Sequence, residues 1–269
     1  MSALLGLLPF VFGAVAIVVY ARAKRPIARS LGLNASRWSP LEVVIGLAIT
    51  FVAIGLTLVA ELALGAVRLE PGSLTWSSLW SDLLSHLILA AAIEELLYRV
   101  LLLSGLAVVL SPVRGGRWIA VLLSAALFGA AHLGNPGASW VAAVGTGLGG
   151  VMYGVAFLGT RSVWLPFGLH LGWNLAQGVF GFPISGHVVP GMFATVPAAD
   201  DVLVLTGGTY GPEAGIPGML ARFVVIGLVV LYLSSRWPDG RFTTLRYAPE
   251  PRRRSRPRPS SAADTEWRG

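Results

Sequence analysis

The chain has no cysteine and few charged residues. The absence of cysteine among its 269 residues excludes a disulfide framework, a thiolate metal site and a cysteine nucleophile. Charged residues make up 12% of the chain, whereas soluble domains carry about 25%. Hydrophobic residues make up 55%, and the mean hydropathy is +0.72. A water-soluble core of this length could not hide so much apolar surface, so we expect the chain to lie in a bilayer.

Apolar runs of about 20 residues, the length that a spanning helix requires, recur along the chain. We therefore expect an all-α fold, a multi-pass transmembrane helical bundle of about seven spans. The predicted spans lie at about 3–20, 41–60, 83–110, 117–134, 139–160, 162–181 and 218–235. Segment 72–82 carries Trp76 and Trp80 and is typical of a membrane interface, where indole rings concentrate.

Three regions follow from this layout. Residues 1–80 hold the N-terminal spans and the interfacial segment, and residues 81–235 form a membrane core. Residues 236–269 form a basic tail without an apolar period, which we predict to be disordered and cytoplasmic. The loop 182–217 is rich in Gly, Pro and Val, and no motif in it carries chemistry.

The basic residues predict the orientation. Most of the 20 Lys and Arg residues lie in connections 21–40 and 111–117, at Arg161 and in the tail, which the positive-inside rule places in the cytoplasm. We expect an N-terminus outside and, from the Ala-, Gly- and Arg-rich composition, a bacterial plasma membrane. A net charge of +7 attracts nucleic acid in some proteins, but these residues form no folded patch, so we expect no nucleic-acid partner.

Three charged residues lie inside the third span. Each of Glu94, Glu95 and Arg99 costs roughly 2.5–3.5 kcal/mol at the centre of a spanning helix, so they must face protein or a water-filled cavity. Glu95 and Arg99 are four residues apart and can form an ion pair on one helix face. Glu94 lies about 100° round the helix from Glu95 and can face elsewhere. An unpaired carboxylate in a pocket of low dielectric holds a proton more readily, which suits a general base.

Two histidines and an asparagine add to this cluster. His132 ends the fourth span, and His170 and Asn174 share one face of the sixth. A single membrane histidine is most often an interhelical hydrogen bonder, but these groups together indicate a polar site. Such a site could bind a metal, or it could orient a water and stabilise an oxyanion. His86 and His187 have no polar neighbour at helical spacing, and we interpret them as structural.

These motifs resemble the signature of the CPBP family of intramembrane proteases. The family includes the CAAX prenyl endopeptidases and bacterial relatives grouped as bacteriocin-processing or self-immunity proteins. The resemblance covers about residues 80–181 and rests on Glu94-Glu95-Leu-Leu-Tyr-Arg99, Phe128-xxx-His132 and His170-xxx-Asn174.

The resemblance implies an intramembrane endopeptidase that cleaves a protein or peptide substrate in the membrane. Glu94 would activate water with the assistance of His132, and His170 and Asn174 would stabilise the oxyanion. Glu95 and Arg99 would support the geometry of the site.

Several alternatives stay open. A divalent metal such as zinc would be held by His132, His170 and Glu94, although their spacing is not His-Glu-x-x-His. A non-catalytic immunity or scaffold protein of the same fold would keep the motifs for stability. A proton-coupled transporter would use the buried Glu and His residues as a relay, but the motifs occur once each, without an inverted repeat. In the N-out orientation the cavity should open toward the outer half of the bilayer.

Overall fold

The computed structural model describes residues 3–199 and 202–237, and most of them are helical. Four helical segments in this part of the chain are long and apolar enough to cross a membrane. They are α3 (Ser39–Ala63), α8 (Trp140–Thr160), α11 (Ile216–Arg236), and α7 (Gly116–Ala131) with its 3₁₀ extension η3 (His132–Gly134). Helix α1 (Ala3–Arg22) contains a shorter apolar stretch.

The predicted third span is a chain of helical pieces with two π-helical segments. It takes in the end of η1 (Leu79–Leu84), then α5 (Ser85–Glu95), η2 (Leu96–Leu103) and α6 (Ser104–Val109), with η1 and η2 the π-helical ones. The predicted interfacial segment before it holds α4 (Trp76–Ser78) and most of η1. The predicted sixth span is α9 (Trp164–Val179), a helix of 16 residues. Because the third span is divided and α9 is short, seven spans are not confirmed. The π-helical segment η2 begins directly after Glu95, and π-helical turns are frequent at functional sites.

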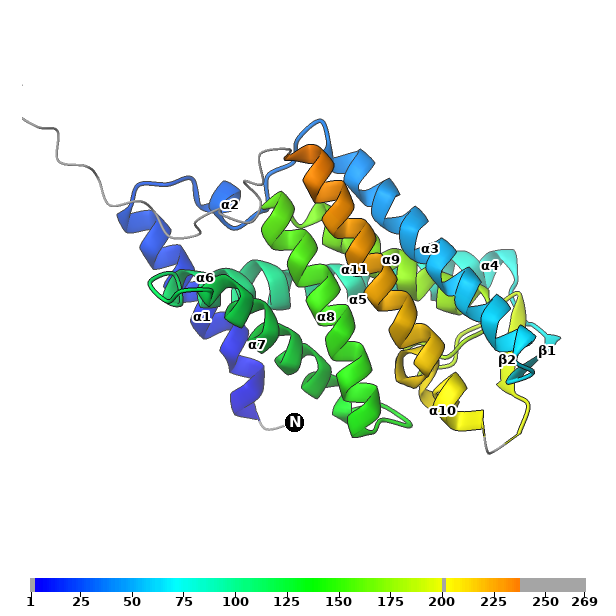
Figure 1. Cartoon of the computed structure of the whole chain (residues 1–269). Coiled ribbons are helices and arrows are strands. Elements are labelled where there is room, and N and C mark those ends of the chain that lie inside the picture. Colours follow the sequence, from blue (N-terminus) through cyan, green and yellow to red (C-terminus); the bar gives the residue numbers. More distant parts are fainter. Residues whose placement is uncertain (1–2, 200–201, 238–269) are drawn as a thin grey trace, which may run out of the picture.

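Glycines allow the helices to pack closely. A Cβ at Gly46 of α3 would lie 2.5 Å from a backbone nitrogen of α9, and one at Gly150 of α8 would lie 2.8 Å from a backbone carbon of α7. Close approach through small residues is the usual basis of helix packing in membranes. In Figure 1, α3, α8 and α11 run beside one another, with α5 and α9 behind them. The first contact brings α3 against α9, and the second brings α8 against α7.

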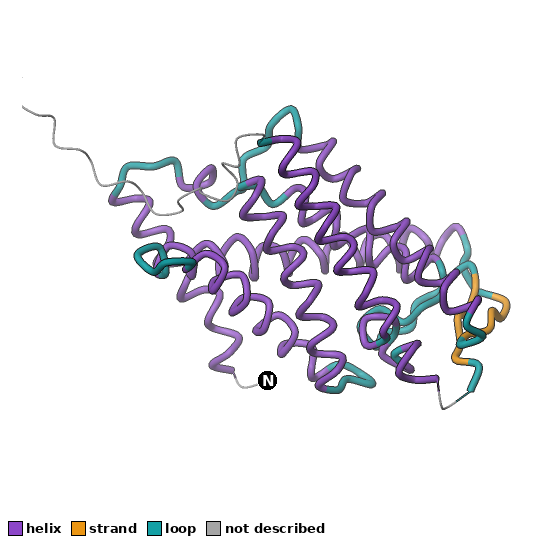
Figure 2. The backbone as a smooth tube through the Cα atoms, viewed as in Figure 1, coloured by secondary structure: helices purple, strands orange, loops and turns teal. Residues whose placement is uncertain are grey.

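A two-stranded sheet departs from the predicted all-α fold. Strand β1 (Val67–Pro71), after α3, pairs antiparallel with β2 (Phe193–Pro197), and the two strands lie at one end of the bundle (Figure 2). The strands are five residues each and lie far apart in the sequence, so neither gives a detectable apolar alternation on its own. The pairing ties the end of α3 to the segment that follows α9.

The remaining described elements are short. They are α2 (Ile27–Ser30), α10 (Leu203–Thr206) and the 3₁₀ turns η5 (Gly208–Tyr210) and η6 (Pro212–Ala214). We call residues 182–215, between α9 and α11, the cap segment. The predicted disordered tail lies outside the described residues from 238 onward, and the division into regions 1–80 and 81–235 stays a prediction.

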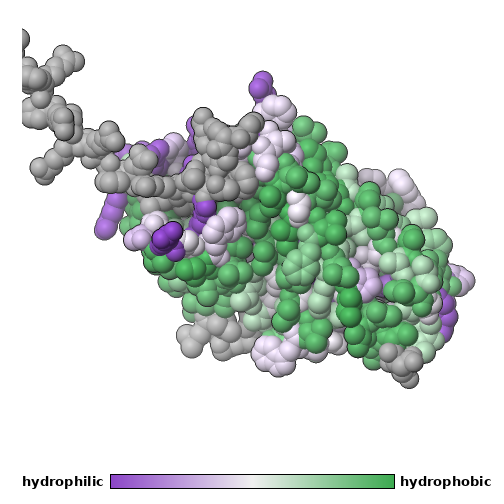
Figure 3. All heavy atoms as spheres, in the orientation of Figure 1, coloured by the Kyte–Doolittle hydropathy of each residue, from purple (hydrophilic) through white to green (hydrophobic). Residues whose placement is uncertain are grey.

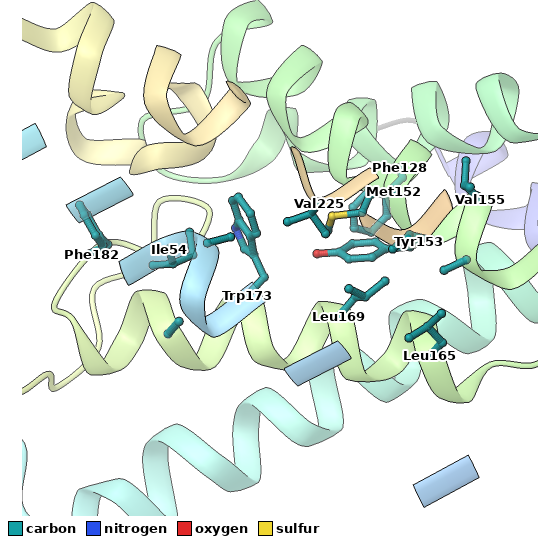
Figure 4. Packing of buried hydrophobic residues seen from close by; sticks show 14 of the residues in the cluster. Ile54, Phe128, Met152, Tyr153, Val155, Leu165, Leu169, Trp173, Phe182 and Val225 are labelled. Carbon is teal, nitrogen blue, oxygen red and sulfur yellow. The ribbon is translucent and has the colours of Figure 1, made fainter. Parts of the chain in front are cut away.

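The core and the surface both fit a membrane protein. Tyr153 and Trp173 pack with Val225 at the centre of a core drawn from α3, α7, α8, α9 and α11 (Figure 4). Hydrophobic residues cover most of the face over α8, α11 and α3, and hydrophilic side chains gather toward the end where α2 lies (Figure 3). Trp76 and Trp80 are exposed and meet edge to face, with ring centroids 5.6 Å apart.

Candidate active site

A cavity of about 810 Å³ brings four of the six predicted site residues together. Its walls come from α5, η2, α7, α8, α9, the start of α11 and the cap segment. The four predicted residues that line it are Glu94, His132, His170 and Asn174. Glu95 and Arg99 do not line the cavity and lie behind it.

Glu94 faces both histidines. Its Oε2 lies 3.9 Å from Nε2 of His132 and 3.7 Å from Nε2 of His170, and its side chain is 30% exposed. Within the part of the chain that the structure describes, this Oε2 is buried and has no hydrogen-bond partner. The carboxylate is therefore positioned by the fold yet free to bind something in the cavity.

The other ring nitrogen of each histidine is already engaged. Nδ1 of His132 donates to the carbonyl oxygen of Phe128 at 2.8 Å, because a carbonyl oxygen can only accept. Nδ1 of His170 donates to Oε1 of Glu95 at 2.9 Å. In the neutral imidazoles both Nε2 atoms then carry lone pairs directed toward Glu94, so three acceptor atoms converge. A water between them has two hydrogens and would therefore donate to two of these three acceptors at a time.

A buried ion pair supports His170. Nε of Arg99 lies 3.3 Å from Oε2 of Glu95, and both side chains are almost fully buried. The pair that the four-residue spacing predicts is thus present, and the other oxygen of Glu95 accepts from His170. The Arg99 guanidinium also lies over the rings of Phe128 and Tyr153, at 4.5 and 4.8 Å from their centroids.

Tyr153 is a neighbour that the motifs did not indicate. Its ring stacks on the imidazole of His170, with centroids 4.7 Å apart and planes inclined by 15°. The hydrogen bond from Nδ1 and this stacking together fix the orientation of the His170 ring. Tyr153 lies three residues beyond Gly150 on α8, so the close packing of α8 brings it there.

The sequence interpretation missed the contribution of the cap segment. Ser185, His187 and Glu213 line the cavity, as do His86 of α5 and Arg222 of α11. His86 and His187, interpreted as structural, therefore line the same cavity as the predicted site residues. Arg222 was the signal in the sequence that could have indicated this contribution. It is a charge inside an apolar helix, and such a charge requires a buried partner.

The cap segment is attached to the bundle at several points. Nδ2 of Asn135 donates to the carbonyl oxygen of Ser185 at 2.9 Å, and the hydroxyls of Thr146 and Tyr210 lie 2.8 Å apart. Burial raises the pKa of Tyr210 to about 12, so its hydroxyl keeps its proton. These bonds hold the cap segment over the cavity.

A metal ion in the cavity would need a set of ligand side chains around it. The imidazole and carboxylate donors are of the kind that zinc takes. However, among residues 3–199 and 202–237 no group of three His, Cys, Asp or Glu side chains is placed to hold an ion. We derive no step of the reaction through a metal.

Residues 76–176 match a family model described as Rce1-like, type II CAAX prenyl endopeptidase Rce1-like. This match supports the resemblance of the chain to the CPBP and CAAX protease family. The matched segment runs from α4 into α9 and contains all six predicted site residues, whereas α1, α3, the cap segment and α11 lie outside it. Together with the apolar helices, the Rce1-like match supports an integral membrane protein that is an endopeptidase. No curated protein and no solved structure matches the chain.

Proposed function

We propose that the chain is an intramembrane endopeptidase that hydrolyses peptide bonds of membrane-associated proteins or peptides. The observation that carries the proposal is the convergence of Glu94 with the Nε2 atoms of His132 and His170 in one cavity. The Rce1-like match over the same segment favours this chemistry over that of a transporter.

In the proposed mechanism, Glu94 and His132 hold the attacking water. The water donates one hydrogen to Oε2 of Glu94 and the other to Nε2 of His132, and Glu94 takes the proton as the oxygen attacks the carbonyl carbon. When the tetrahedral intermediate collapses, Glu94 gives this proton to the amide nitrogen, the C–N bond breaks and the amine leaves. A positioned general base contributes about 10²–10⁴-fold to such a step. The bond from Nδ1 of His132 to the backbone keeps its Nε2 an acceptor.

His170 and Asn174 stabilise the tetrahedral oxyanion in this proposal. They lie one turn apart on α9, and both line the cavity. In this step Nε2 of His170 carries a proton and donates to the oxyanion, while Nδ1 keeps its bond to Glu95. Each donor directed at a developing oxyanion contributes about 10²–10³-fold to the rate. Glu95 and Arg99 are positioning residues that act through His170.

We also propose the plasma membrane of a bacterium, with the N-terminus outside and the C-terminus cytoplasmic. The basic residues near the end of α1 and in the connection before α3 support this orientation. The cap segment and the cavity that it covers then lie toward the outer half of the bilayer.

The decisive test is Glu94→Gln, which is nearly isosteric but cannot accept the proton. The purified parent and variant would be incubated with a peptide library, with and without a chelator. We expect the parent to cleave and the variant to lose at least about 10²-fold in rate. The matched control is Glu61→Gln, which removes a buried carboxylate of α3 outside the cavity and should leave cleavage unchanged.

The outcomes separate the alternatives. Equal cleavage by parent and Glu94→Gln would refute the role of Glu94. Loss of cleavage in a variant with parental folding and peptide binding would refute the scaffold alternative. Loss of parental activity in the chelator arm, restored by added zinc, would favour a metallo-type mechanism over a carboxylate-activated water.

A further inference from the structure

A second buried ion pair lines the cavity of the proposed active site. Nη2 of Arg222 donates to Oε1 of Glu213 at 2.7 Å, and both residues are at least 97% buried. The hydroxyl of Ser185 donates to Oε2 of Glu213 at 2.6 Å, and Nη1 of Arg222 donates to the carbonyl oxygen of Gly145. Neither member of the pair belongs to the family-matched segment.

Stability alone does not account for this pair. Replacing a buried ion pair by apolar side chains of similar volume is often neutral or stabilising, whereas removing one partner costs about 3–5 kcal/mol. The pair is instead held in a fixed position on the cavity wall. Glu213 comes from η6 in the cap segment, and Arg222 comes from α11, where its guanidinium lies 4.5 Å from the ring centroid of Trp173.

The pair leaves this part of the wall without a net charge. The unit charges of Glu213 and Arg222 neutralise each other at contact distance. Several other wall residues are apolar, and they come from both α5 and the cap segment: Leu87, Ala90, Ile184, Val188 and Val189. A charged substrate group placed here would lose its water and would find both protein charges already paired, which is unfavourable.

We propose that Glu213 and Arg222 form a specificity-determining subsite that accepts a substrate side chain without net charge. This inference rests on the proposed endopeptidase function and concerns the choice of peptide, not the cleavage step. Each charge of the pair masks the other. Removing one residue of the pair leaves the charge of the other unpaired. That unpaired charge would then bind a substrate group of the opposite charge.

The consequence is a change of charge preference that depends on which partner is removed. In Glu213→Gln the Arg222 cation is left without its carboxylate, and an acidic peptide side chain supplies the missing partner. In Arg222→Gln the Glu213 carboxylate is left without its cation, and a basic peptide side chain supplies the missing positive charge. If the ion pair had only a structural role, its loss would lower activity toward all peptides alike.

The test uses peptides that carry Asp, Asn or Lys at each position in turn. Cleavage is measured with each variant, and binding of the fluorescently labelled peptides is measured with each variant in the Glu94→Gln background. We expect the parent to prefer Asn at one position. At that position Glu213→Gln should increase cleavage and binding of the Asp peptide relative to the Asn peptide. Arg222→Gln should increase those of the Lys peptide relative to the Asn peptide, each by about tenfold.

Two further variants control the test. Glu70→Gln removes a carboxylate from an exposed pair with Arg68 on β1 and should keep the parental preference. The double variant Glu213→Gln with Arg222→Gln leaves no unpaired charge, so it should remain folded if a single variant does not. The double variant should keep the parental preference for Asn, because its wall again carries no net charge.

Parental preferences in the two single variants, or improved cleavage and binding of Asp or Lys peptides in the folded double variant, would overturn the subsite. A change of preference in peptide binding without any cleavage by the parent would uphold the subsite and refute the endopeptidase. Cleavage by the parent without a change of preference in the variants would uphold the endopeptidase and refute the subsite. Absence of peptide binding as well as cleavage would refute both.

Discussion

Replacing Arg99 by methionine is the most informative test of how the site is supported. Methionine keeps much of the apolar contact that Arg99 makes with the rings of Phe128 and Tyr153. It removes the charge that faces Glu95, which has no solvent exposure. The variant therefore leaves one carboxylate buried without a cation, directly behind His170.

The size of the effect follows from the geometry. At an effective dielectric constant of about 20, two unit charges at the 3.3 Å separation of Arg99 and Glu95 interact by roughly 5 kcal/mol. Loss of one partner from a buried pair typically costs about 3–5 kcal/mol. We expect Arg99→Met to lower the free energy of unfolding by about 4 kcal/mol. For a chain of this length, that loss corresponds to a fall in Tm of roughly 10 °C.

Thermal unfolding in detergent, followed by tryptophan fluorescence, measures this effect. The matched control is the double variant Glu95→Gln with Arg99→Met, which removes both charges. The amide oxygen at position 95 still accepts from Nδ1 of His170, so most of the lost stability should return. A Tm for Arg99→Met within about 2 °C of the parent would refute the reasoning. A double variant as unstable as the single one would also refute it.

Three further predictions concern packing, catalysis and orientation. Gly46→Ala should cost about 1–3 kcal/mol of stability, because its Cβ would lie 2.5 Å from the backbone of α9. Asn174→Ala should lower kcat by about 10²-fold with little change in KM, because it removes a donor that acts on the oxyanion. A cysteine at Val188, in a chain without other cysteines, should react with an impermeant maleimide added outside intact cells.

Each of these predictions has a control. The nearest atom to a Cβ at Gly55, on the same helix, is 3.6 Å away, so Gly55→Ala should not destabilise; an equal loss at both glycines would contradict the packing argument. A change confined to KM in Asn174→Ala would contradict the oxyanion role. A cysteine at the exposed Arg25 should react only after the cells are opened, and the reverse labelling pattern would contradict the orientation.

Local patterns in the sequence were enough to predict a membrane protein with a cluster of polar residues inside it. The scarcity of charge predicted a membrane protein because apolar surface on that scale cannot be buried in water. The four-residue spacing of Glu95 and Arg99 predicted their ion pair because residues at that spacing share a helix face. His170 and Asn174 were placed on one face by the same periodicity.

The tertiary structure decided how those groups meet. The hydrogen bond between His170 and Glu95 joins residues 75 positions apart, and it depends on how α5 packs on α9 rather than on either helix alone. The π-helical segment after Glu95 is likewise not visible in the apolar pattern, because widening the helical turns leaves the composition unchanged. The same is true of the short β1–β2 pairing.

The contrast is clearest for the charged residues. The sequence by itself determined that Glu94, Glu95 and Arg99 must be sheltered from lipid, because an unshielded charge in a spanning helix is too unfavourable. Only the tertiary structure decided that Arg222 is sheltered by Glu213, a residue of the cap segment that no periodicity connects to it. Helical spacing reports neighbours within one helix, whereas partners from different segments are set by which faces of the folded chain come together.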